Sequence, residues 1–403
     1  MKVPKNWVIH PVGHLFEVQL GKMLNEKAKM GDSHLPYLTN FNVQWSRFNL
    51  GVLNTMYFTE RERKKFELKQ GDLIVCEGGE VGRCAIWKEQ IKPCYYQKAL
   101  HRLRPKDSSI LPEFMLAYMK FAAGTRRLSD LTSQSSIAHL TREKLVTLDV
   151  MTPPVIEQRK IAAILTTWDD ALETLDALIT AKDRRKRALM QQLLTGRQRF
   201  PAFGKRAWTK VRMSQVLERV FRPIEWSADM PLSLISIRRR CGGLFRRPDL
   251  LGSEYKTQDL HDLRAGDFLV SKRQVAHGAW AMVTPEFAGG HVSKEYAIFV
   301  NIAPAKLHMP FFAWLARTPR MIRLSRVAST GVHIEKLIFD PDVFLRESIR
   351  IPADLAEQRQ IAAILDTADQ ELTLLRAQRN ALDQQKRGLM QRLLTGKIRV
   401  RTY

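Results

Sequence analysis

The apolar residues of one segment recur at alternating steps of four and three along the chain. In residues 157–199 they fall at Ile161, Leu165, Trp168, Leu172, Leu175, Ile179, Leu189 and Leu193. This spacing places the apolar side chains on one narrow stripe of a helix, as in the seam of a coiled coil. The pattern therefore predicts one long helix that needs a partner for its seam.

The same segment occurs a second time, displaced by 200 residues and aligned without a gap. About 25 of the 43 residues in 357–399 match the first copy, an internal repeat far above chance. Its seam consists of Ile361, Leu365, Ala368, Leu372, Leu375, Leu382, Leu389 and Leu393. The chain is thus predicted to be two half-proteins, each ending in a long helix, with two similar sites.

Both copies carry helix start and stop signals. Proline precedes each copy, glutamate lies in each first turn, and glycine closes each copy, with the first set at Pro153, Pro154, Glu157 and Gly196 and the second at Pro352, Glu357 and Gly396. About 40 residues give a helix on the order of 60 Å. The other copy is the obvious partner, although a homodimer through one helix is an alternative. Lys186 and Lys386 occupy seam positions, where a polar residue can fix the register.

The regions before the helices correspond more loosely. Residues 70–75, QGDLIV, are echoed by residues 265–270, AGDFLV, and Trp87 is echoed by Trp280. Short β-rich runs flank the Gly-rich residues 77–83, as in a hairpin. Helices are predicted over residues 113–123 and 310–317.

Each half therefore reads as a mixed α/β domain followed by a helix, so the fold class is α+β. We place the boundaries at 1–152 for the first domain, 153–200 for the first helix, 201–350 for the second domain and 351–403 for the second helix. Residues 197–206 read as the linker between the halves.

Charge points to a polyanionic partner. The chain of 403 residues has 65 Lys and Arg against 41 Asp and Glu, a net charge of +24, and a pI of about 10.1. Such an excess is typical of nucleic-acid binding. An acidic protein or a membrane surface is the alternative partner.

Cysteine usage and hydropathy favour the cytoplasm. No segment is apolar over the length that spans a bilayer, and the N-terminus lacks the apolar core of a signal peptide. Cys76, Cys84, Cys94 and Cys241 form no C-x-x-C pair. Three of them with His101 could be forced into a zinc site, but the spacing fits no standard ligand pattern, and buried thiols are the preferred interpretation. We therefore expect no metal site.

Catalytic motifs are missing. An adenine methyltransferase needs an Asp/Asn-Pro-Pro-aromatic tetrapeptide, and residues 152–155, TPPV, lack both the polar residue and the ring. No phosphate-binding G-x-x-x-x-G-K-[ST] loop is present. No clear pattern of a metal-dependent nuclease occurs either. We expect a chain without catalytic residues.

DNA-reading candidates are polar and basic residues at predicted loop tips and strand ends, where Arg, Lys, Asn and Gln can reach base edges or phosphates. The alternative for each one is a solvated surface residue, and the basic runs at 61–65 and 184–187 have the same two interpretations. The candidates are Gln44, Arg47, Asn49, Tyr95, Gln97, Lys98, Ser133, Gln134, Lys272, Arg273, Gln274, Lys294, Tyr296, Thr330 and His333.

The whole pattern resembles the specificity subunit of type I restriction-modification systems. The resemblance rests on the helix opening E-Q-[RK]-x-I-A-x-I-L at 157–165 and 357–365. It also rests on the closing L-[ML]-x-x-L-L-T-G at 189–196 and 389–396. Both motifs are specific, whereas the two domains match the family in frame only.

This resemblance implies two target recognition domains that each read one half of a bipartite DNA site. It implies an antiparallel coiled coil that sets the spacing between the half-sites. It also implies docking of two modification subunits, which carry S-adenosylmethionine, and of restriction subunits, which use ATP and Mg. The chain itself would bind no cofactor and would work in the cytoplasm of a prokaryote. A stand-alone two-domain DNA-binding regulator and a fused methyltransferase-nuclease are the alternatives.

Overall fold

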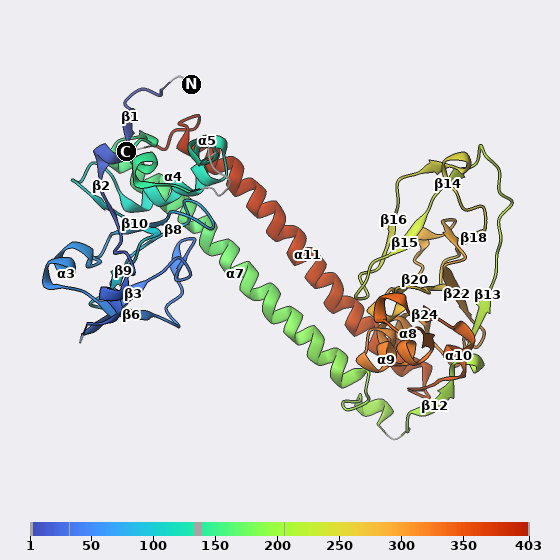
Figure 1. Ribbon diagram of the computed structural model, residues 1–403. Coiled ribbons are helices and arrows are strands. Elements are labelled where there is room, and N and C mark those ends of the chain that lie inside the picture. Colours follow the sequence, from blue (N-terminus) through green and yellow to red (C-terminus); the bar gives the residue numbers. More distant parts are fainter. Residues whose placement is uncertain (1–2, 32, 133–138, 205, 402–403) are drawn as a thin grey trace. The chain divides into compact units, whose positions relative to one another are not determined.

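The computed structural model describes residues 3–31, 33–132, 139–204 and 206–401 (Figure 1). The chain forms two compact units. Unit 1 is Met1–Asp176 with Ala377–Tyr403, and unit 2 is Ala177–Arg376. The boundaries fall inside the two long helices, α7 (Val155–Leu193) and α11 (Leu355–Leu394). Each unit therefore combines an α/β domain with half of each long helix. The division at residues 152, 200 and 350 stays a prediction.

Unit 1 is built around a four-stranded antiparallel sheet in the order β2-β10-β7-β8. Its strands are β2 (Phe16–Leu20), β10 (Leu100–Pro105), β7 (Leu73–Cys76) and β8 (Cys84–Ile86). A three-stranded sheet and two strand pairs surround it, with the elements β1 (Val8–Pro11), β11 (Asp149–Thr152), β3 (His34–Leu38), β6 (Asn54–Tyr57), β9 (Tyr95–Tyr96), β4 (Val43–Gln44) and β5 (Arg47–Phe48). The helices of the domain are α1 (Val12–Leu15), α2 (Glu26–Lys29), α3 (Glu60–Phe66), α4 (Pro112–Ala123), α5 (Arg126–Thr132) and α6 (Arg142–Val146).

Unit 2 repeats this plan. Its four-stranded antiparallel sheet has the order β13-β22-β19-β20, with β13 (Leu217–Val220), β22 (Tyr296–Asn301), β19 (Phe268–Ser271) and β20 (Trp280–Met282). The strand pairs are β12 (Thr209–Arg212) with β25 (Ser348–Ile351), β14 (Pro231–Leu232) with β17 (Leu250–Leu251), β15 (Ile235–Ile237) with β16 (Leu244–Arg246), β18 (Leu260–Asp262) with β21 (His291–Ser293), and β23 (Ser329–Thr330) with β24 (Ile338–Phe339). The helices are α8 (Met309–Ala316), α9 (Pro319–Val327) and α10 (Pro341–Arg346).

Strand register corrects one sequence correspondence. Val75 pairs with Cys84, and its equivalent Val270 pairs with Trp280. Trp280 therefore matches Cys84, whereas Trp87 matches Val283, whose backbone N–H likewise bonds to the aspartate of the preceding Gly-Asp turn. The predicted echo of Trp87 by Trp280 is wrong by three residues. Two tryptophans near the same place were matched by residue type, and only the ladder shows which residues share a position.

The other local predictions are confirmed. Helices α4 and α8 lie where residues 113–123 and 310–317 were predicted to be helical, and each has proline in its first turn. Strands β7 and β8 pair antiparallel across the Gly-rich residues 77–83. Proline is accepted at a helix start because the backbone N–H that it lacks would be unpaired there.

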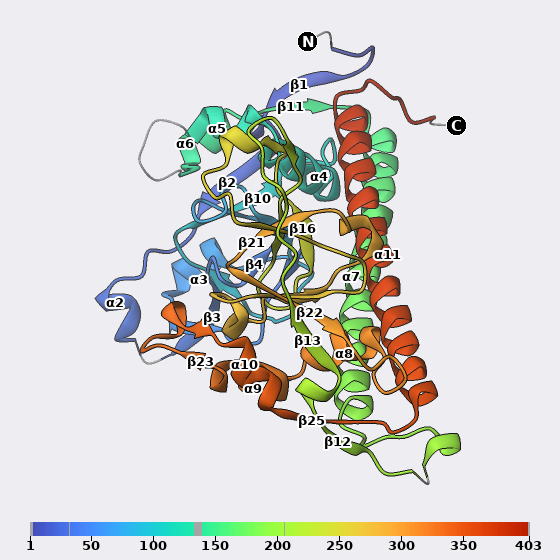
Figure 2. The same cartoon turned by 90° about the vertical axis from the view of Figure 1, so that its right-hand side faces the viewer.

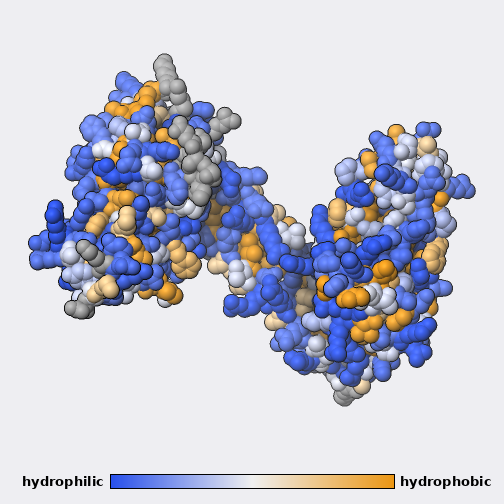
Figure 3. Space-filling view, viewed as in Figure 1, coloured by the Kyte–Doolittle hydropathy of each residue, from blue (hydrophilic) through white to orange (hydrophobic). Residues whose placement is uncertain are grey.

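Each unit has its own apolar core next to the helix ends. In unit 1, residues of α4 such as Phe114 and Tyr118 pack with Ile161 of α7 and Leu394 of α11. In unit 2, Phe311 and Phe312 of α8 pack in the corresponding core, with residues from both long helices. The face of each unit seen in Figure 3 is mostly hydrophilic, with smaller hydrophobic patches. The seam of the helices thus continues into the core of each domain.

Within each unit the halves of α7 and α11 run antiparallel, side by side in both views (Figures 1 and 2). In unit 1, Lys386 pairs with Asp169, and in unit 2, Lys186 pairs with Asp369 at 2.6 Å. These are the two lysines predicted at the seam. They are partly buried, and each one reaches an aspartate of the opposite helix. This antiparallel pairing confirms the predicted coiled coil and gives each seam lysine a partner that only one register provides.

The end of each long helix is tied to the start of the other by a buried ion pair. In unit 1, Arg399 donates to Glu157 at 2.8 and 2.9 Å, and in unit 2, Arg199 donates to Glu357 at 3.0 and 2.7 Å. Burial by itself raises the pKa of Glu157, but hydrogen bonds from Arg399 and Trp7 outweigh it and hold the pKa below its usual value. The glutamate of each E-Q motif therefore pairs with the arginine that lies three residues after the glycine of the other copy's T-G.

The glutamine of each motif fixes the domain to its helix. Gln158 accepts a hydrogen bond from the N–H of Leu111 and donates to the carbonyl oxygen of Ser109, just before α4. Gln358 makes the same bonds to His308 and Lys306, just before α8. Both glutamine residues are fully buried. A buried amide with satisfied partners holds one orientation of domain and helix.

Candidate nucleic-acid interface

The two Gly-Asp turns place the central strands of both sheets. Asp72 and Asp267 are buried. Each accepts one hydrogen bond from the backbone N–H three residues earlier and two from the guanidinium group of an arginine. The arginines are Arg104, at 2.7 and 2.6 Å, and Arg222, at 2.6 and 2.9 Å. These arginines come from different positions in the two units, so the turn is shared and its partner is not. The aspartates are structural, which leaves function to the loops around the sheets.

In unit 1, a small hairpin presents three of the predicted residues. Gln44 ends β4, Arg47 begins β5, and Asn49 follows it; Arg47 and Asn49 are exposed and Gln44 is half-buried. Arg47 lies 3.7 Å from Glu173, but both side chains are 72% exposed. Such a pair contributes little in water, so Arg47 can leave it for a phosphate. Phe41, 64% exposed, lies beside the hairpin and was not predicted.

Three further unit 1 predictions have different outcomes. Tyr95 is 3% exposed and stacks on Phe58 in the core, with ring centroids 4.3 Å apart. The prediction that Tyr95 contacts DNA is therefore corrected, because its ring is used in packing. Gln97 and Lys98 remain accessible and line a shallow hollow of about 730 Å³. Ser133 and Gln134 lie outside the described residues.

In unit 2, the predicted residues come together at one end of the sheet. Lys272, Arg273 and Gln274 form the turn after β19, and the Lys272 N–H bonds to the carbonyl oxygen of Glu295, between β21 and β22. Arg273 pairs with Glu295 at 2.5 Å. This backbone contact brings the turn beside the connection that carries Lys294 and Tyr296.

The remaining two candidates belong to the same region. The N–H of Phe339 bonds to the carbonyl oxygen of Lys272, and β24 pairs with β23, which contains Thr330. Thr330 is exposed at the end of β23, and His333 and Val332, the latter 93% exposed, lie on the segment between the two strands. An exposed apolar side chain beside polar ones is suited to the thymine methyl group. Lys294 pairs with Asp259 at 3.6 Å, and the Tyr296 hydroxyl bonds to Ser236 at 3.4 Å.

Sequence reasoning missed a basic group next to this turn. Arg239 bonds to the Gln274 side chain and pairs with Glu335 at 3.1 Å, while His277 lies 3.2 Å from Glu335. Arg240 lines the hollow beside them. The signal was the run of three arginines, residues 238–240, which only Cys241 separates from Gly242 and Gly243.

Lys272 lies near the cations of Arg219 and Lys294, which the carboxylates of Glu295 and Asp259 partly offset. Partial burial is the largest cause that lowers its pKa, and the nearby charges of Arg219 and Lys294 lower it further. A cation held close to other cations gains more from an approaching phosphate than an isolated lysine does. The geometry and electrostatics of this turn suit the backbone or bases of nucleic acid.

Three of the four cysteines are buried as predicted, and Cys241 is partly buried. Cys76, Cys84 and Cys94 are buried, and burial raises the pKa of Cys94 to about 12. Within the described ranges, no three His, Cys, Asp or Glu side chains are grouped as metal ligands would be. Of the helices in the described part of the chain, none has both the length and the apolar character needed to cross a bilayer.

Comparisons with known proteins agree with this architecture. Residues 4–181 match the family model described as the type I restriction modification DNA specificity domain. A putative type I restriction enzyme MjaX specificity subunit from Methanocaldococcus jannaschii is 22% identical over the whole chain and 96% of its own length. The MjaVIII specificity subunit from the same organism is 20% identical over the whole chain and 95% of its own length.

Solved structures share the fold. The type I restriction-modification S subunit from M. genitalium superposes with a TM-score of 0.60 at 14% identity, covering 98% of both chains. The HsdS subunit from Thermoanaerobacter tengcongensis gives a TM-score of 0.52 at 17% identity, covering 99% of both chains. The repeated domains, the antiparallel helices and these likenesses define a two-domain specificity protein. Residues 4–181 match the family of type I restriction modification DNA specificity domains, and over its whole length the chain is similar to type I restriction enzyme specificity subunits.

Proposed function

We propose that each α/β domain reads one half of a bipartite DNA site and that the paired long helices set the distance between the halves. The observation that carries the proposal is the duplication itself. The same sheet, helix and strand pair occur in both units, and each is joined to its helices by the same buried glutamate and glutamine contacts. Two equal folds with different loops suit two different half-sites.

The exposed loops supply the chemistry for reading. In unit 1 the hairpin carries Gln44, Arg47 and Asn49, and in unit 2 the turn carries Lys272, Arg273 and Gln274. Amide and guanidinium groups form bidentate hydrogen bonds with adenine and guanine, and lysine binds phosphate. The net charge of +24 supports attraction to the duplex over the whole surface.

The chain supplies specificity and its partners supply the reaction. Specificity subunits are generally non-catalytic, and the sequence offers no methyltransferase or nucleotide-binding motif. In this proposal two modification subunits dock on the helices and bring S-adenosylmethionine. Restriction subunits then add ATP-dependent cleavage, with Mg. The chain holds no cofactor of its own and works in the cytoplasm of a prokaryotic cell.

The test is to combine the purified chain with the modification subunit of its own system, measuring the mass of the complex by light scattering and DNA methylation by sequencing. The expected result is a complex of two modification subunits with one specificity chain that methylates a split site. Sequence-specific DNA binding by this chain alone, without any complex, would instead favour a stand-alone regulator.

A matched pair of variants tests the unit 2 surface. Lys272→Ala with Arg273→Ala is expected to reduce methylation of the cognate site while the complex still assembles. Lys210→Ala with Arg212→Ala removes the same two charges from exposed positions of β12 and is expected to leave methylation unchanged. Equal methylation by the two variants would remove this turn from the interface.

A further inference from the structure

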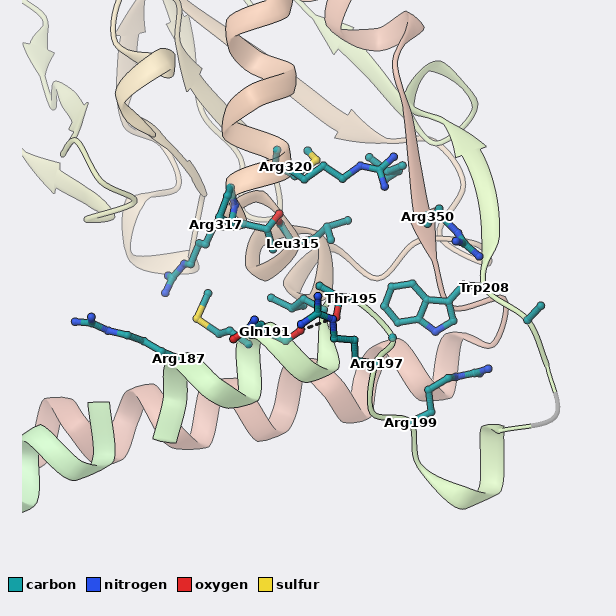
Figure 4. Close-up of a pocket in the computed structure, with 18 residues that line it drawn as sticks. Arg187, Gln191, Thr195, Arg197, Arg199, Trp208, Leu315, Arg317, Arg320 and Arg350 are labelled. Carbon is teal, nitrogen blue, oxygen red and sulfur yellow. Dashed lines mark hydrogen bonds between the residues drawn. The ribbon is translucent and has the colours of Figure 1, made fainter. Parts of the chain in front are cut away.

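Unit 2 contains a cavity of about 900 Å³ whose chemistry DNA reading does not use. It lies between the C-terminal end of α7, the turn joining α8 to α9, and strand β25. Figure 4 shows arginine side chains around it, with Arg187 and Trp208 at opposite ends. The six lining arginines are Arg187, Arg197, Arg199, Arg317, Arg320 and Arg350. Among the described residues that line the cavity, none is acidic.

Half of these arginines have no counter-charge among the described residues. Arg199 is paired with Glu357, while Arg187 and Arg317 lie near Asp183 and Asp369. The other three, Arg197, Arg320 and Arg350, form no ion pair with any part of the chain that the structure describes, and all three are exposed. Several like charges around one hollow repel each other and favour an anionic occupant.

The floor of the cavity is apolar. Leu194, Leu315 and Ile349 line it and are at most 6% exposed, and the Trp208 ring is partly exposed at its end. DNA phosphates would pair with the arginines but leave the apolar floor exposed to water. An uncharged hydrophobic ligand would cover the floor but desolvate unpaired arginines, which is costly. A segment with an apolar side chain among carboxylates satisfies both parts.

Comparison of the two units shows that several residues lining this cavity have different equivalents in unit 1. The helix side recurs in unit 1, where Lys397 stands for Arg197. The domain side does not recur. The hydroxyls of Thr125 and Thr318 each donate to the carbonyl oxygen three residues earlier, so the two threonines occupy equivalent positions. Gly124 of unit 1 therefore stands where unit 2 has Arg317.

The strand register shows the second difference. Arg350 pairs with Lys210 of β12. Lys210 corresponds to Ile9 of unit 1, and Ile9 pairs with Met151. Met151 therefore occupies the position of Arg350 in unit 1. The equivalent tryptophans differ as well. Trp7 is 5% exposed and donates to Glu157, whereas Trp208 lines the cavity and, among the described residues, its indole N–H has no acceptor. Two arginines and an accessible indole ring are thus special to unit 2.

We propose that this cavity docks an acidic segment of a modification subunit, one with an apolar side chain flanked by Asp or Glu. The proposal rests on the proposed function and makes it more specific, because it separates the two modification subunits. The subunit on unit 2 is held largely by arginine–carboxylate contacts, and the subunit on unit 1 is not. Arginine suits this role because its planar group binds carboxylates bidentately and packs on aromatic rings.

The experiment compares two double charge reversals in the full chain, each mixed with the purified modification subunit. Arg320→Glu with Arg350→Glu reverses two exposed residues of the cavity rim. Arg323→Glu with Arg346→Glu changes the net charge equally at exposed positions of the same unit that do not line the cavity. Circular dichroism and thermal melting verify that both variants fold. Light scattering and titration calorimetry then give the stoichiometry and Kd.

The rim variant is expected to bind the second modification subunit more weakly by roughly 10-fold or more, because rim charge pairs become repulsive. A complex with one modification subunit then accumulates, while the control variant keeps two. Unchanged stoichiometry and Kd in the rim variant would overturn the proposal. Retained subunit binding with weakened DNA binding would also overturn it and make the cavity a phosphate site. Failure of the unmodified chain to bind the modification subunit would refute the proposed function itself.

Discussion

Removing the arginine that pairs with the buried glutamate, Arg199 in unit 2 or Arg399 in unit 1, should destabilise the two units by different amounts. In unit 2, Glu357 is 1% exposed, and within the described ranges its side chain accepts hydrogen bonds from Arg199 alone. Arg199 also donates to the carbonyl oxygens of Phe203 and Arg206. In unit 1, Glu157 accepts bonds from Arg399 and, in addition, from the Trp7 indole at 3.1 Å and the Val400 N–H at 3.3 Å.

The difference can be given a magnitude. Loss of one partner from a buried ion pair costs about 3–5 kcal/mol, because the remaining charge is stranded. We expect about 4 kcal/mol for Arg199→Ala, whose side chain is 18% exposed. For Arg399→Ala we expect about 2 kcal/mol, because two donors remain and the side chain is 41% exposed and screened by water. The gap of about 2 kcal/mol corresponds to a factor of about 30 in the folded population.

Urea unfolding read by tryptophan fluorescence measures the loss of stability, and hydrogen exchange in the first turns of α7 and α11 assigns it to a unit. The control is Glu357→Gln, which removes the stranded charge. In that background Arg199→Ala should cost much less, since little charge remains to be uncompensated. Equal losses from Arg199→Ala and Arg399→Ala, or an unchanged cost in the Glu357→Gln background, would refute the reasoning.

Three further outcomes are expected. Replacing Gly196 or Gly396 with Ala is expected to cost about 1–2 kcal/mol in a melting experiment, because φ is +69° and +66° at these positions. The cost should be larger at Gly396, whose added Cβ would lie 2.3 Å from a proline. Equal costs at the two positions would contradict this. Hydrogen bonds to Glu157 and Asp169 outweigh burial and lower both pKa values, so their contribution is present above the unfolded pKa and lost as the pH falls through the folded one. Acid titration of unit 1 should therefore show weakening below about pH 4, and a flat stability there would speak against these contacts. Phe344→Ala opens a cavity in a fully buried site of unit 2 and costs about 3–5 kcal/mol, with hydrogen exchange in unit 1 unchanged.

The long helices were predictable because their information is local. A seam with steps of three and four, a proline start and a glycine stop act within a few residues of each other. The repeat then indicated the partner. The buried Gln158 carries no local signal, since its three hydrogen bonds reach residues up to 49 positions away. Its recurrence in the second copy marked it as important without revealing its contacts.

The exposure of the candidate DNA-binding residues was predictable only in part. Loop position and residue type selected Arg47 and Lys272, which are accessible, but the same criteria selected Tyr95, which is buried. Arg239 was missed because it lies 35 residues from Gln274 in sequence, and only the fold brings their side chains together. Exposure is a property of packing, which one residue's type and neighbours in sequence do not determine.

By itself, the sequence determined that this protein is duplicated, basic, helical in two long repeated segments and built from two similar α/β domains, because each property is carried by periodicity, composition or repetition. Tertiary structure decided which contacts join the parts: the Arg–Glu pairs, the register of the sheets and the arginine cavity of unit 2. These depend on side chains from distant segments meeting in space. Two halves that share more than half of their helix sequence can therefore differ in the surfaces that they offer to partners.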